Sequence, residues 1–387
     1  MDRPVRTFKR ANNCLPNTSH HARRNSGDSC RAPFGVTYVG VYVDKIVALR
    51  SGALGDCVVA EPALRLLRGA FPQGDITALG DPYGGDLLSA MGHADRVVKL
   101  THRGRKTRYL RELLSLRRQR FDLLVDFQLS GHSRFQIALI GAKHRLGLDK
   151  GHRSANNFYT QISPFDRSVH AAVRMAKTLS PLGVEVPLEG LSPQFEIGDR
   201  YYEEAANLLR AHEIARPYAI LQPTSGQRPE YRRWPAERFA AVADHLSRIG
   251  YVVLVTSAAR SPGVAAVMEH AHSPIHNLTG ATSPLTLAAI IEGASLYVGY
   301  NTGPMHIAAA VGTPIVALYD VPNDDFEWYP LGSTPRRLVK AKPVDQFPGW
   351  RMDTIEAVEV IHSIEELRST APARETQPAG RQFAGLV

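Results

Sequence analysis

Cysteines are scarce in this chain, and long apolar runs are missing. Three of its 387 residues are cysteine, and Cys14, Cys30 and Cys57 show no metal-ligand spacing. An odd and sparse set argues against a disulfide scaffold and suits a reducing compartment. No run of about 18 apolar residues is present that could span a bilayer as a helix. From these absences we expect a cytoplasmic protein.

Two nucleotide-binding signatures are also missing. The chain has no Gly-x-Gly-x-x-Gly fingerprint and no Gly-Lys-Ser/Thr turn. A dinucleotide-binding domain and a P-loop are therefore unsupported, and an NAD-dependent oxidoreductase is disfavoured. We expect no cofactor.

Positive charge is abundant but unevenly placed. The chain has 46 Lys and Arg against 37 Asp and Glu, a net charge of +9. Residues 1–33 alone hold seven Lys and Arg against two Asp, a net +5. The rest of the chain is only mildly basic, so no nucleic-acid partner is predicted.

The first residues lack the apolar core of a secretory signal, although their Arg, Ser and Asn content resembles that of a transit peptide. We interpret residues 1–43 as a disordered polar extension, or as the product of a start codon placed too early, rather than as a targeting segment.

Short apolar runs alternate with amphipathic stretches from about residue 44 onward. This alternation is typical of βαβ units and predicts parallel sheets. In the first half we expect strands at 45–50, 75–80, 96–100 and 122–127, with helices at 57–71 and 108–120. In the second half we expect strands at 218–222, 251–257, 295–300 and 313–320, with helices at 235–250, 284–294 and 304–312.

The predicted fold is therefore α/β, with two tandem Rossmann-like domains. Pro and Gly cluster between 181 and 200, which places the junction there. We assign the domains to 44–195 and 196–350. A helix over 351–369 and a disordered polar tail over 370–387 complete the chain.

Ligands of parallel sheets bind beyond the carboxyl ends of the strands, so the loops there are candidate sites. The first such loop runs from Arg50 to Asp56, and Gly52 and Gly55 permit a tight turn and close approach of another molecule. Asp56 opens the next helix. Capping of that helix and service as a general base are both compatible with this position.

The second loop, residues 222–235, combines the small residues Thr224 and Ser225 with Arg228, Arg232 and Arg233. Guanidinium groups beside a helix N-terminus favour a diphosphate through charge-assisted hydrogen bonds. A solvated basic loop is the simpler alternative.

The third loop leads from a strand into a helix at 299–309, with Pro304 in the first turn. Such a helix start favours anions. Asn301, the Thr302 hydroxyl and the amide of Gly303 are candidate phosphate ligands. His306, one turn further, either donates another hydrogen bond or is a half-buried structural histidine.

Residues 101–120 carry eight Lys and Arg against the single acid Glu112. A solvated helix face explains this pattern. The alternative is peripheral contact with an anionic membrane, on the cytoplasmic face of the inner membrane, or with a phosphorylated acceptor.

Four stretches together resemble glycosyltransferase family 9, the heptosyltransferase group, which has the GT-B architecture. They are KIVALRSGALGDCVVAEPALRLLR, LLVDFQLSGHSR, RRWPAERFAAVADHL and VGYNTGPMHIAAAVGTPIVALYD. The resemblance extends over roughly residues 44–365.

The resemblance implies an inverting, metal-independent transfer from a nucleotide sugar, typically ADP-heptose, to a lipid A–core or related acceptor. It places the acceptor in the first domain and the donor in the second. The catalytic base falls on Asp56 and the phosphate-binding basic residue on Arg232, while the donor-contacting helix start falls on Asn301, Thr302, Gly303 and His306. The absence of an Asp-x-Asp pair agrees with a metal-free mechanism.

Three positions depart from the family pattern. Asn301 stands where the family usually has Asp, and Gln222-Pro223-Thr224 stands in place of His-Pro-Gly. The acid that commonly contacts the ribose is missing from residues 257–263. A nucleotide-sugar epimerase of the same architecture and a catalytically silent nucleotide-sugar-binding protein remain alternatives.

Overall fold

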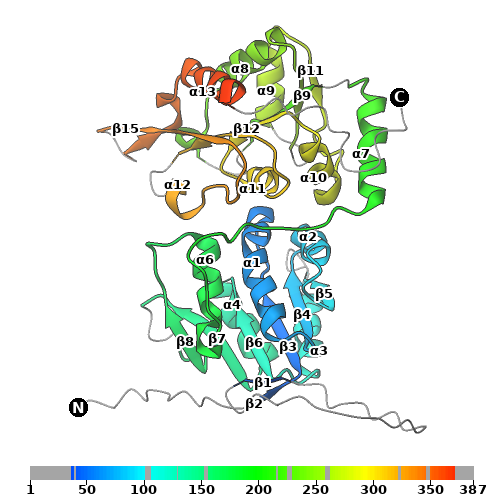
Figure 1. Ribbon diagram of the computed structural model, residues 1–387, viewed down its shortest axis with the longest axis vertical. Helices are drawn as coiled ribbons and strands as arrows, with labels where there is room; N and C mark the ends of the chain where they lie inside the picture. Colours follow the sequence, from blue (N-terminus) through cyan, green and yellow to red (C-terminus); the bar gives the residue numbers. More distant parts are fainter. Residues whose placement is uncertain are drawn as a thin grey trace, which may run out of the picture. The chain divides into compact units, whose positions relative to one another are not determined.

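The computed structural model describes residues 36–38, 41–100, 106–128, 130–151, 156–214, 217–224, 229–257, 262–320, 324–345 and 349–370. They contain two six-stranded sheets, each flanked by helices (Figure 1). Two separate antiparallel two-stranded sheets are also present: β1 (Val36–Tyr38) with β2 (Val41–Val43), and β15 (Lys342–Pro343) with β16 (Trp350–Arg351). The first described strand begins at Val36, within the range 1–43 that the sequence assigns to an extension.

The first sheet is entirely parallel, in the order β5-β4-β3-β6-β7-β8. From the central strand β3 the chain adds β4 and β5 on one side of the sheet, and it then adds β6, β7 and β8 on the other side. This is the doubly wound order. The strands are β3 (Lys45–Leu49), β4 (Asp75–Gly80), β5 (Arg96–Lys99), β6 (Leu123–Asp126), β7 (His144–Asp149) and β8 (Gln161–Pro164).

Alternate residues of β3 pack into two different hydrophobic cores, because successive side chains of a strand point to opposite faces of the sheet. Ile46 and Ala48 pack toward α1, and Val47 and Leu49 pack toward α3 and α4. The helices of this half are α1 (Leu54–Ala70), α2 (Gly84–Ala90), α3 (Lys106–Arg117), α4 (Gly131–Ile140), α6 (Ala171–Ala176) and the 3-10 helix η1 (Lys177–Leu182).

The second sheet repeats the same parallel order, as β11-β10-β9-β12-β13-β14. Its strands are β9 (Tyr218–Gln222), β10 (Val252–Val255), β11 (Ile275–Asn277), β12 (Leu296–Tyr300), β13 (Ile315–Tyr319) and β14 (Arg336–Lys340). Its helices are α7 (Asp199–Ala211), α8 (Ala236–Arg248), α9 (Pro262–His270), α10 (Pro284–Glu292), α11 (Gly303–Ala310), α12 (Asp324–Glu327) and α13 (Ala357–Thr370), with 3-10 turns η2 (Glu230–Arg232) and η3 (Met352–Thr354).

The predicted α/β fold with two Rossmann-like sheets is confirmed. The sequence reading missed β7, β8, β11 and β14, which are short or carry polar residues and so lack a long apolar run. Across the described stretches, we find no helix with the length and apolarity needed to cross a bilayer.

One hydrophobic core joins the two halves. It contains Val58 and Leu64 of α1 together with Met305 and Ile307 of α11, so these helices pack on each other (Figure 1). At their N-terminal ends the contact is between backbones. A Cβ atom on Gly303 would lie 2.9 Å from the backbone nitrogen of Gly55.

A second contact between the halves joins α6 to the segment around α12. Nε2 of the buried His170 donates a 3.0 Å hydrogen bond to the carbonyl of Tyr329, while Nδ1 accepts one from the Ala172 amide. Burial lowers the pKa of His170 to about 4, so the ring is neutral near pH 7. Beside it, Arg174 forms a 3.1 Å ion pair with Glu327.

The backbone contact between α1 and α11 predicts a cost for any side chain there. Gly303→Ala forces the two helix ends apart, and we expect it to lower the free energy of unfolding by about 1–3 kcal/mol, as overpacking does. Gly69→Ala is the matched control, because Gly69 is exposed in α1 with open space around it. That change should stabilise α1 by up to about 1 kcal/mol. Urea unfolding measures both, and equal effects would contradict the close packing.

Candidate functional site

The strand order places a candidate site in each half. In each sheet the order in which the chain adds strands reverses at one point. This point lies between β3 and β6 in the first sheet and between β9 and β12 in the second. Ligands of doubly wound sheets bind at such points. The Gly52–Asp56 loop follows β3, and the Asn301–Gly303 turn follows β12. Because α1 and α11 begin at these loops and touch, the two points lie next to each other.

Asp56 lies in the first turn of α1, and a third of its side chain is exposed. The helix begins at Leu54 with Ala53 as its N-cap, and that cap makes no side-chain hydrogen bond in the described structure. The interpretation of Asp56 as the capping residue is therefore wrong. Its Oδ1 forms a 3.0 Å ion pair with Nη2 of Arg50, and its carbonyl accepts a 3.0 Å bond from Nε of the same side chain.

Arg50 is a candidate site residue that the sequence reading did not single out. It is buried, directly follows β3, and also donates to the carbonyl of Phe127 after β6. Its guanidinium thus ties the Asp56 carboxylate to the ends of two adjacent strands. The signal in the sequence was weak, since an Arg at a strand end is common.

Gly52 and Gly55 both sit where a side chain would collide. A Cβ on Gly52 would lie 3.0 Å from Oδ2 of Asp56, and one on Gly55 would lie 2.9 Å from the His306 ring. The first glycine leaves room for the carboxylate, and the second lets α11 approach.

Arg232 ends the turn η2 in the second half, with about a third of its side chain exposed. Its Nε pairs with Oδ2 of Asp320, a buried carboxylate that directly follows β13. The backbone nitrogen of Asn301 bonds to Leu318 of β13, so β13 links Arg232 to the start of α11. Ser225 and Arg228 lie outside the described residues.

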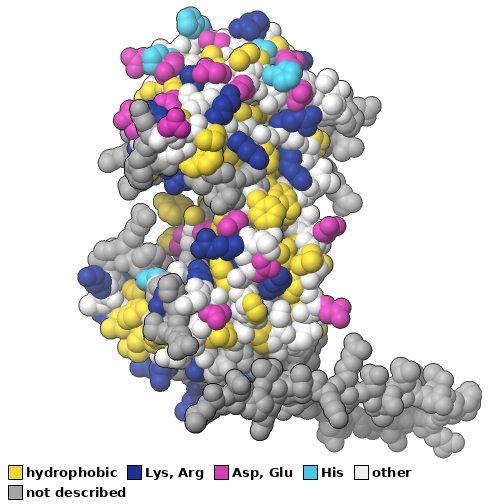
Figure 2. All heavy atoms as spheres, turned by 90° about the vertical axis from the view of Figure 1, so that its left-hand side faces the viewer, with side chains coloured by type: hydrophobic (Ala, Val, Ile, Leu, Met, Phe, Trp, Pro, Cys, Tyr) yellow, Lys and Arg dark blue, Asp and Glu magenta, His cyan; other side chains and the backbone are white. Residues whose placement is uncertain are grey.

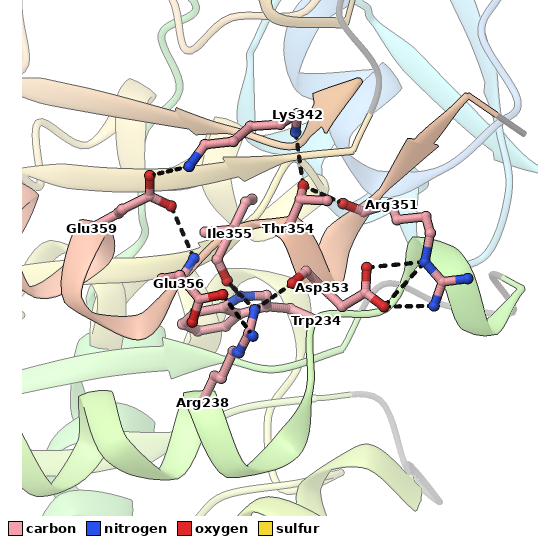
Figure 3. Close-up of polar contacts among 9 residues, drawn as sticks. All are labelled: Trp234, Arg238, Lys342, Arg351, Asp353, Thr354, Ile355, Glu356 and Glu359. Atoms are coloured by element: carbon pink, nitrogen blue, oxygen red, sulfur yellow. Dashed lines mark hydrogen bonds and ion pairs between the residues drawn. The ribbon is translucent and has the colours of Figure 1, made fainter. Parts of the chain in front are cut away.

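The Trp-Pro motif after Arg232 is held by the C-terminal segment (Figure 3). The Trp234 indole donates a 2.8 Å hydrogen bond to the carbonyl of Ile355, and Arg238 donates to the carbonyls of Asp353 and Ile355. The Trp234 amide reaches the hydroxyl of Tyr300 at the end of β12. These hydrogen bonds hold in place the backbone that follows Arg232.

The start of α11 has the features of an anion site. Thr302 is the N-cap residue, and its side chain makes no capping bond in the described structure. The first N–H groups of a helix have no partner within it, and Pro304 is tolerated there for that reason. Asn301 is buried beside them. Peptide N–H groups and the helix dipole at this end attract negative charge.

His306 is buried rather than half-buried, and its ring lies against Gly55 and 6.3 Å from Trp328 between ring centroids. Burial, with a smaller effect from His170, lowers the pKa of His306 to about 3. The ring is therefore neutral near pH 7. It can donate one hydrogen bond and accept another, but it adds no positive charge to the site.

Thr224 belongs to a chain of neutral side chains at the end of β9. Gln222 donates from Nε2 to the Thr224 hydroxyl at 2.7 Å and accepts from Thr256 at 2.6 Å, and Thr224 lies 3.0 Å from the hydroxyl of Ser257. Gln222 and Thr224 stand where the family pattern has His and Gly. Residues 258–261 after Ser257 lie outside the described structure.

A polar network lines the same edge of the first sheet. Asp126, buried at the end of β6, accepts 2.7 Å hydrogen bonds from the hydroxyls of Ser133 and Tyr159. Next to it, the Ser51 hydroxyl donates to Gln128 at 2.5 Å. Hydroxyl and amide groups of this kind suit a polyhydroxylated ligand.

The described residues support neither a metal-binding cluster nor a reactive cysteine. Within the described ranges, no three His, Cys, Asp or Glu side chains are arranged to hold a metal ion. Cys57, one residue after Asp56, is buried, and burial raises the pKa of its thiol to about 12, so it remains protonated and unreactive. The groups that these loops present include the partly exposed Asp56 carboxylate, the Arg232 guanidinium and the N-terminus of α11.

The family model described as "Glycosyltransferase family 9 (heptosyltransferase)" matches residues 110–339. Lipopolysaccharide heptosyltransferase 3 of Escherichia coli K12 is 25% identical over 288 residues, which cover 71% of this chain and 82% of that protein.

Two solved structures have a fold similar to that of this chain. The crystal structure of a glycosyl transferase family 9 protein from Veillonella parvula has a TM-score of 0.74 and 25% identity, covering 84% of this chain and 97% of that one. An Escherichia coli heptosyltransferase solved with ADP-2-deoxy-2-fluoro heptose has a TM-score of 0.63 and 20% identity, covering 83% and 99%. The chain therefore belongs to glycosyltransferase family 9 and is a glycosyltransferase with the two-sheet GT-B architecture.

Proposed function

We propose that this enzyme transfers heptose from ADP-heptose to a lipopolysaccharide-core acceptor by an inverting, metal-independent reaction. The supporting observation is the backbone contact between Gly55 and Gly303. This contact supports the proposal because Asp56 directly follows Gly55 in α1, and Gly303 opens α11, whose N-terminal end attracts anions. The family assignment favours transfer over the epimerase reaction that a two-sheet architecture alone leaves open.

Asp56 is the general base in this proposal. An acceptor hydroxyl attacks the anomeric carbon of the donor sugar as its proton passes to the Asp56 carboxylate. The bond from that carbon to the diphosphate breaks on the opposite face, so the configuration inverts. Arg50 orients the carboxylate through Oδ1, and the exposed third of the Asp56 side chain leaves it accessible to an acceptor.

The leaving diphosphate is held in the second half. Arg232 offers a guanidinium, and the start of α11 offers Thr302, the Gly303 amide and the helix dipole. Positive charge at this place stabilises the negative charge that builds on the departing oxygen. No metal ion is invoked, because these groups supply the positive charge themselves.

ADP-heptose is the favoured donor for two reasons. A heptosyltransferase of similar fold was solved with an ADP-heptose analogue. In addition, the side chains of Gln222, Thr224 and Ser257 form a neutral hydrogen-bonding surface at the end of β9 that suits sugar hydroxyls and a nucleoside. Asn301 retains hydrogen-bonding capacity where the family usually has an acid.

A membrane contact through α3 follows from the same proposal, since the acceptor is lipid-linked. Lys106 and Arg111 are exposed on this helix, and Arg118 is exposed directly after it. Beside them, Leu110, Leu114 and Phe135 are 40%, 41% and 48% exposed. Cations around exposed apolar side chains are typical of surfaces that dock on anionic lipid.

Replacement of the base tests the mechanism. Asp56→Asn removes the proton acceptor but keeps the shape, so we expect kcat to fall by about 100-fold or more, while ADP affinity stays nearly unchanged. Asp75→Asn at the opposite, amino-terminal edge of the sheet is the control. Transfer assays and calorimetry measure the two effects, and unchanged turnover of the Asp56 variant would refute the role.

Calorimetry with ADP-, GDP- and UDP-sugars tests the donor site. We expect ADP-heptose to bind most tightly. Arg232→Gln should weaken its binding by about ten- to a hundredfold, since a charged hydrogen bond contributes about 1.5–3 kcal/mol. Arg232→Lys should recover part of this loss, and Arg96→Gln should cause none. Equal affinity for the three nucleotides would contradict the proposed donor.

Sedimentation with liposomes tests the α3 surface. The double variant Arg111→Gln/Arg118→Gln should bind anionic vesicles at least about tenfold more weakly at low salt, because each cation contributes about 1 kcal/mol there. The pair Arg337→Gln/Arg351→Gln removes the same charge from the second half as a control. Binding that ignores salt and lipid charge would reject this surface.

A further inference from the structure

A buried hydroxyl near the start of α11 lacks a hydrogen bond. It belongs to Tyr297 of β12, a residue with none of its surface exposed, and no described residue is a hydrogen-bond partner for it. The core around Tyr297 includes Met305 and Ile307 of α11. Charged side chains are spread over the face of the molecule that Figure 2 shows, whereas this hydroxyl lies inside a hydrophobic core.

The Tyr297 side chain extends toward the loop that follows β12. Side chains two residues apart in a strand share a face, so Tyr297 and the position of Gly299 lie on the same side of the sheet. A Cβ atom on Gly299 would lie 3.0 Å from the hydroxyl oxygen of Tyr297. The hydroxyl is therefore at the carboxyl end of β12, where Asn301 and Thr302 begin the donor loop.

Thr302 is the polar side chain that acts on this hydroxyl. Burial raises the pKa of Tyr297, and the Thr302 side chain opposes that rise, because its hydroxyl is near enough to stabilise the phenolate. The two hydroxyls nevertheless do not complete a hydrogen bond in this structure. Thr302 instead donates to the carbonyl of Tyr300 over 3.4 Å, which is long for a hydrogen bond between oxygens.

The Tyr297 hydroxyl does not stabilise the fold. A buried polar group without a partner costs free energy, and such groups are rare in folded proteins. Phenylalanine would fill the same space without that cost. Groups that lower stability in this way are found where a protein binds or reacts, because function there requires them.

We propose that Tyr297 is a positioning residue of the donor site and acts on the diphosphate through Thr302. This role rests on the proposed function, since the diphosphate must bind at the start of α11. A hydroxyl has one hydrogen and two lone pairs. When Tyr297 donates to the Thr302 oxygen, the single hydrogen of Thr302 turns from the Tyr300 carbonyl to a phosphate oxygen, which only accepts.

The two hydroxyls form a relay that ends on the anion. Hydrogen bonds in a chain polarise one another, so donation from Tyr297 strengthens donation from Thr302. Thr302 is partly exposed and reaches the ligand, whereas Tyr297 is fully buried and does not touch it. Tyr297 therefore recovers the cost of its burial only when a diphosphate is present.

Removal of the Tyr297 hydroxyl tests the relay on the full chain. Tyr297→Phe keeps the packed ring and deletes the hydroxyl alone. We expect calorimetry to show ADP binding about three- to tenfold weaker, which corresponds to the loss of one hydrogen bond. Urea unfolding without nucleotide should show an unchanged or higher midpoint, because no hydrogen bond within the protein is lost.

Tyr218→Phe is the matched control in the same hydrophobic core. Tyr218 is 1% exposed at the amino-terminal end of β9, and its hydroxyl donates a 2.8 Å hydrogen bond to the carbonyl of Ile290. This variant should unfold at a lower urea concentration and bind ADP as the wild type does. Opposite effects in two buried tyrosines separate a role in binding from a role in packing.

A double-mutant cycle with Thr302→Val shows whether Tyr297 acts through Thr302. Valine has the shape of threonine without its hydroxyl. We expect Tyr297→Phe to weaken ADP binding no further in the Thr302→Val background, because the relay is already broken there. Additive losses would contradict the role given to Thr302.

Equal affinity of the wild type and Tyr297→Phe for ADP would overturn the role of Tyr297. A loss of stability in Tyr297→Phe as large as that in Tyr218→Phe would overturn it as well, because the hydroxyl would then have a partner in the folded protein. If the wild-type chain does not bind ADP at all, the donor assignment of the proposed function fails instead.

Discussion

The arrangement of the site depends on one steric constraint, the backbone contact between the first turns of α1 and α11. Gly55 and Gly303 each occupy the space that a Cβ of the other would need. Both helices begin where their sheets present ligand-binding loops. The contact therefore brings a carboxylate from one sheet to the anion-attracting helix end of the other. The buried hydrogen bond from His170 and the ion pair of Arg174 hold a second point of the same junction.

Charge is divided between the halves in a way that suits group transfer. The first sheet edge presents Asp56, held by Arg50. The second edge presents Arg232, held by Asp320, and the amides of α11. His306 lies between them as a neutral ring, because burial keeps its pKa near 3. Positive charge at the second sheet edge thus comes from the guanidinium and the helix rather than from histidine.

Departures from the family pattern fall in the second half and share one property. Asn301 and Gln222 are neutral where the family has an acid and an imidazole, and Thr224, which replaces a glycine, bonds to a further hydroxyl on Ser257. Neutral donors and acceptors bind sugar and nucleoside hydroxyls without requiring a charged partner. Donor recognition in this chain is therefore expected to rest on hydrogen-bond geometry more than on charge.

The sequence by itself determined the α/β class, both sheets and the loops with Asp56, Arg232 and Thr302, because apolar alternation and glycine spacing are local signals. It missed edge strands such as β8 and β14, whose polar residues carry no such signal, and it took Asp56 for a possible cap although α1 begins two residues earlier. Only the tertiary structure paired Arg232 with Asp320, 88 positions away. Contacts between distant segments depend on how strands and helices pack, and no local pattern in a single chain encodes them.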